Sequence, residues 1–183
     1  MIKRRRVKPS EYLINGDTCT VVVYGMKDIK RGEVLIDTKD VAKCQQLKWF
    51  VKKRKGISLA AITRIDHKLI RMHHFLFGMP PDELEYDHIN RNPLDNRKSN
   101  LRLCTFEQNQ WNQNNQRTNT SGYKGVVKCS SGKNWFARIT VKGKEKYLGC
   151  FDNKILAAEA YNKAVEFYRD KYAYRNNACM GGA

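Results

Sequence analysis

Some common features are missing from this chain of 183 residues, and each absence excludes a class of protein. No apolar run approaches the roughly 20 residues that a membrane-spanning helix needs, so we expect no membrane contact. The basic N-terminal residues are not followed by an apolar segment, so a secretory signal is not expected either. The six cysteines include no C-x-x-C pair. Dispersed thiols are typical of a reduced cytoplasmic protein and do not indicate structural zinc.

Acidic residues are also scarce. The chain has 18 Asp and Glu against 35 Lys and Arg, a net charge of +17. The excess is uneven, with a net charge of +10 over residues 1–70, −1 over residues 71–116 and +8 over residues 117–183. A merely solvated surface would account for some of this charge. Two basic ends around a balanced centre favour a nucleic acid as the partner, because phosphates dominate the electrostatics of such complexes.

The balanced centre contains the stretch that we expect to carry chemistry, residues 86–112. A strand is predicted to end at Asp87-His88, and an Asn-rich loop leads to a second strand at Leu101–Leu103. Thr105-Phe106-Glu107-Gln108 has the form of a capping box, which predicts that a helix starts there. The pattern therefore predicts a compact ββα unit.

The side chains of this unit suit hydrolysis of a phosphate ester. Adjacent strand residues point to opposite sides, so Asp87 and His88 are expected to have different roles. A carboxylate is a hard ligand for Mg²⁺ or Mn²⁺, whereas a neutral imidazole can take a proton from water. Asn109 offers an amide oxygen as a second metal ligand, and Asn100 could accept a hydrogen bond from the other imidazole nitrogen of His88.

These residues resemble the HNH endonucleases, also called His-Me finger or ββα-metal nucleases, and in particular the phage and intron-encoded homing type. The pattern comprises Asp87-His88-Ile-Asn, Asp95-Asn96-Arg97, Ser99-Asn100-Leu101-Arg102 and Gln108-Asn109. The resemblance implies that His88 is the general base, that Asp87 and Asn109 hold one divalent metal ion, and that Asn100 orients His88. Asn109 stands where the name of the family has its final His, as in some phage homing enzymes. The alternative is a chance Asp-His pair beside an ordinary Asn-rich turn.

His73 is a further candidate, since a His at this place commonly precedes the core in the resembled family. Two roles remain open for it. We favour a structural role, in which the imidazole packs behind the active site, over a catalytic one.

Residues 1–70 are predicted to form a basic, β-rich region with one helix. β-Branched runs at Thr18–Tyr24 and Glu33–Asp37 favour a hairpin turning at Lys30-Arg31-Gly32. Asp40 is expected to cap a short helix that reaches Trp49. The basic residues 3–8 are equally compatible with an arm in a DNA groove and with a frayed tail.

The C-terminal part follows a polar segment that we predict to be a linker, residues 115–121. Three strands are expected within residues 122–151, followed by a helix capped by Asp152-Asn153. Alternation predicts that Trp135, Ala137, Ile139 and Val141 face this helix, which leaves the face bearing Arg138 exposed.

This part resembles the AP2 DNA-binding domain, through Tyr123-Lys-Gly-Val126, Trp135 with Ala137-Arg-Ile139, Leu148-Gly-Cys-Phe151, Ala157-Ala-Glu-Ala-Tyr161 and Ala173 with Asn176. The resemblance implies a three-stranded sheet laid in the major groove of DNA. It places six residues at or near the contact surface, namely Lys124, Lys128, Arg138, Thr140, Lys142 and Tyr147. A module that merely stabilises the fold is the alternative.

The sequence thus predicts an α+β protein with four segments. These are a β-rich region (residues 1–70), a ββα-metal nuclease core (71–114), a linker (115–121) and an AP2-like domain (122–177). We expect a monomeric endonuclease of the homing or phage-mobility kind, which cuts double-stranded DNA with one Mg²⁺ or Mn²⁺ ion in the cytoplasm of a bacterial host cell. The alternative is a non-catalytic, sequence-specific DNA-binding protein or transcriptional regulator.

Overall fold

The computed structural model describes residues 7–54, 57–113, 119–130, 132–169 and 171–177. The chain divides into two compact units, residues 1–105 and 106–183. The four segments expected from the sequence stay a prediction. The β-rich region and the first two strands of the predicted nuclease core lie in one unit, and the helix that follows those strands lies in the other.

The first unit begins with a three-stranded antiparallel sheet in the order β1-β2-β3. Its strands are β1 (Glu11–Asn15), β2 (Thr18–Tyr24) and β3 (Lys30–Asp37). The predicted hairpin is confirmed, but its turn lies earlier than expected. Lys30-Arg31-Gly32 belong to β3, and the connection runs through a short 3-10 turn, η1 (Met26–Asp28).

A second antiparallel sheet has the order β4-β5-β6. Its strands are β4 (Phe50–Arg54), β5 (Ile57–Ile65) and β6 (Lys68–Arg71), and the helix α2 (Met72–Phe77) follows.

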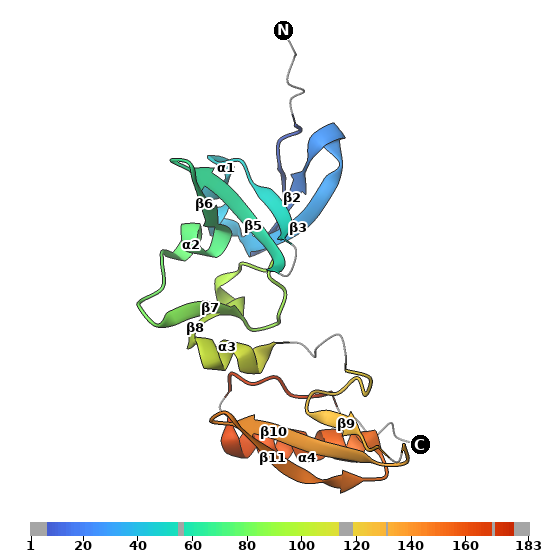
Figure 1. Cartoon of the computed structure of the whole chain (residues 1–183). Helices are drawn as coiled ribbons and strands as arrows, with labels where there is room; N and C mark the ends of the chain where they lie inside the picture. Colours follow the sequence, from blue (N-terminus) through green and yellow to red (C-terminus); the bar gives the residue numbers. More distant parts are fainter. Residues whose placement is uncertain (1–6, 55–56, 114–118, 131, 170, 178–183) are drawn as a thin grey trace. The chain divides into compact units, whose positions relative to one another are not determined.

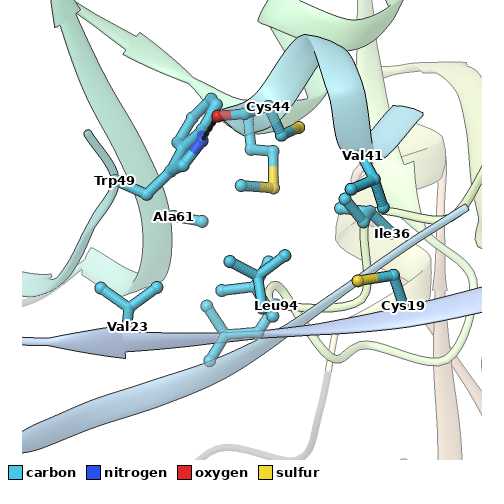
Figure 2. Close-up of a cluster of buried hydrophobic side chains, with 11 residues drawn as sticks. Cys19, Val23, Ile36, Val41, Cys44, Trp49, Ala61 and Leu94 are labelled. Carbon is cyan, nitrogen blue, oxygen red and sulfur yellow. Dashed lines mark hydrogen bonds between the residues drawn. The ribbon is translucent and has the colours of Figure 1, made fainter. Parts of the chain in front are cut away.

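The helix predicted to run from Asp40 to Trp49 is shorter than expected. A 3-10 turn, η2 (Thr38–Asp40), leads into α1, which spans only Val41–Gln45, and the side chain of Asp40 makes no capping hydrogen bond. Trp49 lies in the core instead, where its indole N–H donates to the carbonyl of Cys44 at 2.9 Å (Figure 2). Burying this large side chain and satisfying its N–H favour ending the helix early.

The core of the first unit is made by side chains from both sheets, from α1 and α2, and from one later loop (Figure 2). Its fully enclosed members include Val21, Val34 and Ile36 of the first sheet. Leu94, which is distant from this sheet along the chain, packs in the same cluster. The segment around Leu94 is therefore part of the N-terminal core.

The first unit ends with a two-stranded antiparallel hairpin, β7 (Leu84–His88) and β8 (Leu101–Thr105), with a 3-10 turn, η3 (Lys98–Asn100), between them. The helix α3 (Phe106–Asn112) follows β8 directly. Both predicted strands and the predicted helix start after Thr105 are confirmed.

The second unit contains α3 and a three-stranded antiparallel sheet in the order β11-β10-β9, with a helix across one face (Figure 1). The elements are β9 (Val126–Lys128), β10 (Trp135–Val141), β11 (Lys144–Phe151) and α4 (Lys154–Tyr168). The predicted cap is confirmed at Asn153, whose side chain accepts a hydrogen bond from the backbone N–H of Ile155 at 2.8 Å. The expected alternation is also confirmed, because Ala137 and Ile139 are buried while Arg138 and Thr140 are exposed.

Gly125 allows α4 to pack closely on this sheet. Its φ of +74° is a left-handed conformation that favours glycine. A Cβ atom there would lie 2.1 Å from the ring of Tyr161 and 2.5 Å from the backbone oxygen of Arg138. Glycine is thus required on both counts.

The α+β class is confirmed, with several small antiparallel sheets and a C-terminal three-stranded sheet packed on a helix. None of the helices within the described ranges has the length and apolar character needed to cross a membrane.

Candidate functional site

The hairpin β7-β8 fixes the carboxylate of Asp87. Asp87 stands opposite Arg102 in the strand register, and it is 4% exposed. Arg102 donates to its Oδ2 atom from Nε at 2.9 Å and from Nη2 at 2.7 Å. The guanidinium therefore holds a buried carboxylate in one orientation on the strand.

His88, the next residue, lies in a cluster with His73. The two imidazole rings have centroids 5.3 Å apart and meet edge to face. Burial lowers the pKa of His88 below its ordinary value, while a hydrogen bond with Asn96 and the charge of Asp87 act in the opposite direction. The imidazole of His88 is thus neutral at neutral pH, which is the form that can accept a proton.

His73 comes from the first residues of α2 and is 6% exposed. Burial, together with the neighbouring His88 and His74, lowers its pKa to about 3. Its Nδ1 atom lies 3.4 Å from Oδ1 of Asn96, and its ring also lies against that of Tyr86, with centroids 5.6 Å apart. His73 is therefore a buried, neutral group in contact with the predicted base.

Asn96 was not selected as a site residue by sequence reasoning, although it stands in the quoted Asp95-Asn96-Arg97 motif. It is 1% exposed and lies beside both histidines. A fully buried amide in an otherwise polar loop is a signal of a specific contact, but its partners are not visible from local spacing.

Asn100 has a different set of partners from the one predicted. Its Oδ1 atom accepts from the backbone N–H of Asn90 at 3.0 Å, and its Nδ2 atom donates to Oδ1 of Asn90 at 3.0 Å and to the backbone oxygen of Asp95 at 2.8 Å. The side chain of Asn100 thus ties together the two ends of the loop between the strands, and the amide beside His88 is that of Asn96.

Asp95 and Arg97 stabilise the same loop. Arg97 donates from Nε at 2.8 Å and from Nη2 at 2.7 Å to the two oxygens of Asp95. Burial would raise the pKa of Asp95, but the hydrogen bonds and charge of Arg97 outweigh it, so the pKa lies below its ordinary value. Asp95 remains ionised and keeps the loop closed on Arg97.

The loop is also joined to β3 of the N-terminal region. The backbone N–H of Leu35 donates to the oxygen of Leu94, and that of Asn96 donates to the oxygen of Leu35, both at 2.8 Å. Asp37 accepts from the backbone N–H of Lys98 at 2.9 Å. The N-terminal region therefore supports the segment that carries Asn96, a relationship that the sequence did not predict.

Asn109, the second predicted metal ligand, lies within α3. This helix belongs to the second unit. The pairing of Asn109 with Asp87 on one ion therefore stays a prediction.

Most of the predicted DNA-binding residues lie on the open face of the C-terminal sheet or at its edges. Arg138 stands opposite Tyr147, which is 66% exposed, and makes an exposed ion pair with Glu145 at 2.7 Å. Phe136 and Tyr147 lie on this face with ring centroids 6.4 Å apart. Thr140 and Lys142 are exposed. Lys128 is also exposed, but it stands opposite Trp135 at the edge of the other face, with its ammonium 5.7 Å from the centroid of that ring.

Lys124 is an exception among these residues. Its ammonium group donates to three backbone oxygens at the end of α3, those of Trp111 and Gln113 at 2.8 Å and that of Gln110 at 3.4 Å. The side chain is therefore engaged within the second unit.

Comparisons with known proteins agree with the central motif. Residues 70–111 match the model of a family described as HNH endonuclease. Protein 3.8 of Escherichia phage T7 is 37% identical over 68 residues, which are 37% of this chain and 56% of that protein. An uncharacterized HNH endonuclease of Acanthamoeba polyphaga mimivirus is 31% identical over 112 residues, 58% of this chain and 57% of that protein.

The chain spans a little more than half the length of these two relatives. No solved structure matches it. The family match ends at residue 111, so the AP2 resemblance of residues 122–177 rests on the quoted residues alone. The hairpin that carries Asp87 and His88, the loop with Asn96 and Asn100, and most of α3 lie within the matched range. Residues 70–111 are therefore similar to HNH endonuclease domains.

Proposed function

We propose that the chain is a metal-dependent DNA endonuclease in which His88 is the general base. The observation that carries this proposal is the neutral imidazole of His88, which lies against His73 and Asn96 and follows the fixed Asp87 on the same strand. An HNH domain supports the same reaction class.

His88 would take the proton from the attacking water at an imidazole nitrogen. Burial favours the neutral imidazole, and contact with Asn96 and His73 limits its rotation. A general base must be both unprotonated and correctly oriented, so this surrounding shell contributes to the rate as well as to the fold.

Asp87 and Asn109 would hold one Mg²⁺ or Mn²⁺ ion. The donor set fits such an ion, because a carboxylate oxygen and an amide oxygen are hard ligands and Mg²⁺ needs only one or two protein ligands. When bound, the ion would stabilise the charge that develops on the phosphate and on the leaving oxygen. Arg102 would keep the carboxylate of Asp87 oriented toward this task.

The substrate is proposed to be double-stranded DNA. The net charge of +8 over residues 117–183 supports binding to a phosphate backbone. Lys128, Arg138, Thr140, Lys142 and Tyr147 are the proposed contacts on or around the open face of the AP2-like sheet, and we exclude Lys124 from this set because of its bonds to α3.

The biological setting is proposed from the motif and from the relatives. Similarity to a protein of phage T7 supports a phage-mobility or homing role in the cytoplasm of a bacterial host. The chain is also proposed to act as a monomer, and a monomer with a single site would cut one strand at a time.

One observation favours a second candidate, a DNA-binding protein without catalysis. Arg102 already balances the charge of Asp87, so this carboxylate is stable without any metal ion. In that case the ββα unit would only support the fold.

Cleavage and binding experiments on the full chain separate these two functions. DNA cleavage is measured with Mg²⁺, with Mn²⁺ and with EDTA, and new ends are mapped by sequencing. Metal-dependent ends that disappear with His88→Ala, while DNA binding in EDTA is unchanged, support the endonuclease. His67→Ala is the matched control, because His67 is exposed on the turn between β5 and β6. Tight binding without any new ends would favour the second candidate.

A further inference from the structure

The end of α3 has an unusual partner. The last carbonyl groups of a helix have no N–H donor within the helix. A cation near them is favourable because of the helix dipole. Lys124 supplies an ammonium group with three N–H donors to the carbonyls of Gln110 and Trp111 in the last turn and of Gln113 just after the helix. Its side chain thus stabilises the end of the helix that carries Asn109.

The backbone of Lys124 is itself held in place by Asn176. Oδ1 of Asn176 accepts from the N–H of Lys124 at 2.7 Å, and Nδ2 donates to the oxygen of Lys124 at 3.0 Å. Asn176 is 5% exposed and exchanges two further hydrogen bonds, at 2.8 and 2.9 Å, with the side chain of Asn162 on α4. A continuous series of bonds therefore leads from α4 through Lys124 to α3.

Two other contacts hold the same end of α3. The backbone N–H of Tyr174 donates to the oxygen of Trp111 at 3.1 Å. The guanidinium of Arg169 lies over the ring of Trp111, 5.3 Å from its centroid, and also donates to the oxygen of Thr140 at 2.8 Å. Thr140 lies on the proposed DNA-binding face, so Arg169 links the end of α3 to the strand that carries that face.

We propose that Lys124 is a positioning residue for α3, and through α3 for Asn109, and that it is not a DNA contact. The part that concerns Asn109 rests on the proposed function. To reach a phosphate or a base, the ammonium group would have to leave three carbonyl oxygens. The consequence is that α3 links the proposed cleavage site to the proposed DNA-binding module, because it carries a proposed metal ligand and is anchored to that module.

Lys124→Met and Lys128→Met test the proposal as a matched pair in the full chain. Both remove one ammonium group and keep most of the apolar stem, and Lys128 is an exposed residue of β9. Three quantities are measured for each variant. These are hydrogen exchange of the α3 amides, Mn²⁺ affinity without DNA, and DNA affinity in EDTA.

For Lys124→Met we expect exchange in α3 to accelerate and Mn²⁺ affinity to fall, each by about tenfold, because a cation at a partly buried helix end is worth up to a factor of this size. DNA affinity should change by less than about twofold. Lys128→Met should leave exchange in α3 and Mn²⁺ affinity unchanged and should lower DNA affinity. Lys124→Gln, which keeps two N–H donors without the charge, should fall between wild type and Lys124→Met, and it replaces Lys124→Met if that variant does not fold.

Equal losses of DNA affinity in Lys124→Met and Lys128→Met, with unchanged exchange in α3, would overturn the proposal. A failure of the proposed function would be recognised separately. If wild type neither binds Mn²⁺ nor cuts DNA, the metal site is wrong, whereas exchange in α3 and DNA affinity still decide whether Lys124 anchors the helix or contacts DNA.

Discussion

Arg102 and Asp87 face each other across the β7-β8 hairpin, and two nitrogens of the guanidinium donate to a single oxygen of the carboxylate, Oδ2. The two side chains are 16% and 5% exposed. Arg102 thus orients the proposed metal ligand Asp87. Loss of Arg102 and loss of Asp87 should therefore affect stability and metal-dependent cleavage differently.

Removal of one partner should expose this difference. Arg102→Leu is expected to lower the free energy of unfolding by about 3 kcal/mol, because it leaves a buried carboxylate without its cation. Asp87→Asn should cost less, about 1 kcal/mol, since the amide oxygen can still accept from Arg102, but it should abolish metal-dependent cleavage. Urea denaturation and cleavage assays check both. Glu145→Gln, which breaks the exposed pair with Arg138, is the control and should leave stability unchanged within error.

Asn96 and Asn100 should respond differently to truncation. Asn100→Ala removes three hydrogen bonds from the loop, and we expect it to destabilise the protein by about 2–3 kcal/mol. Asn96→Ala removes the amide beside His73 and His88, and we expect a cleavage rate about tenfold lower with unchanged DNA affinity. Single-turnover cleavage and urea denaturation of both variants measure this. If folded Asn100→Ala lost more of the cleavage rate than Asn96→Ala, Asn100 would be the residue that orients His88.

The low pKa of His73 predicts acid sensitivity. In the folded state burial lowers the pKa of this imidazole to about 3, whereas in the unfolded chain the imidazole takes up a proton near its ordinary pKa of 6.5. The stability is therefore complete above pH 6.5 and is lost as the pH falls toward 3, by up to about 1.4 kcal/mol per pH unit. Urea denaturation between pH 7 and pH 4.5 measures the slope. His73→Gln should flatten it, and an unchanged slope would show that His73 is protonated in the folded state.

Gly125 should tolerate no side chain. Gly125→Ala places a methyl group 2.1 Å from the ring of Tyr161 in a left-handed conformation, so we expect the second unit to lose about 3 kcal/mol of stability. Gly132→Ala is the control, because it has a similar φ of +73° but no atom within 4 Å of the added Cβ. Thermal unfolding of the two variants separates steric overlap from backbone strain alone. Equal losses would mean that packing against Tyr161 contributes nothing.

Sequence reasoning was most successful where the determining pattern is local. The alternation in β10 and the cap at Asn153 depend on neighbours a few residues apart, and both were predicted correctly. The strands of the β7-β8 hairpin and the start of α3 were also found, since their ends are marked by polar and capping residues.

The unpredicted features all depend on distant partners. Lys124 owes its orientation to Asn176, 52 residues later, and Lys98 owes its position to Asp37, 61 residues earlier. Trp49 packs in a core built from both sheets of the first unit, α1, α2 and the loop at Leu94, and α1 ends early. No spacing rule within a short window contains this information. The amide beside His88 was missed for the same reason.

The contact of Leu94 with the N-terminal core bears on what can be cut from this chain. A fragment limited to residues 70–111 would lack β3, so Leu94 would lose its apolar surroundings and Leu35 could no longer pair with the loop. The same fragment would lack Lys124 and Tyr174, which hold the end of α3. The range of sequence that matches the HNH family is thus smaller than the range that supports it, and moving this segment alone between proteins would leave the loop that carries Asn96, beside His88, without its support from β3.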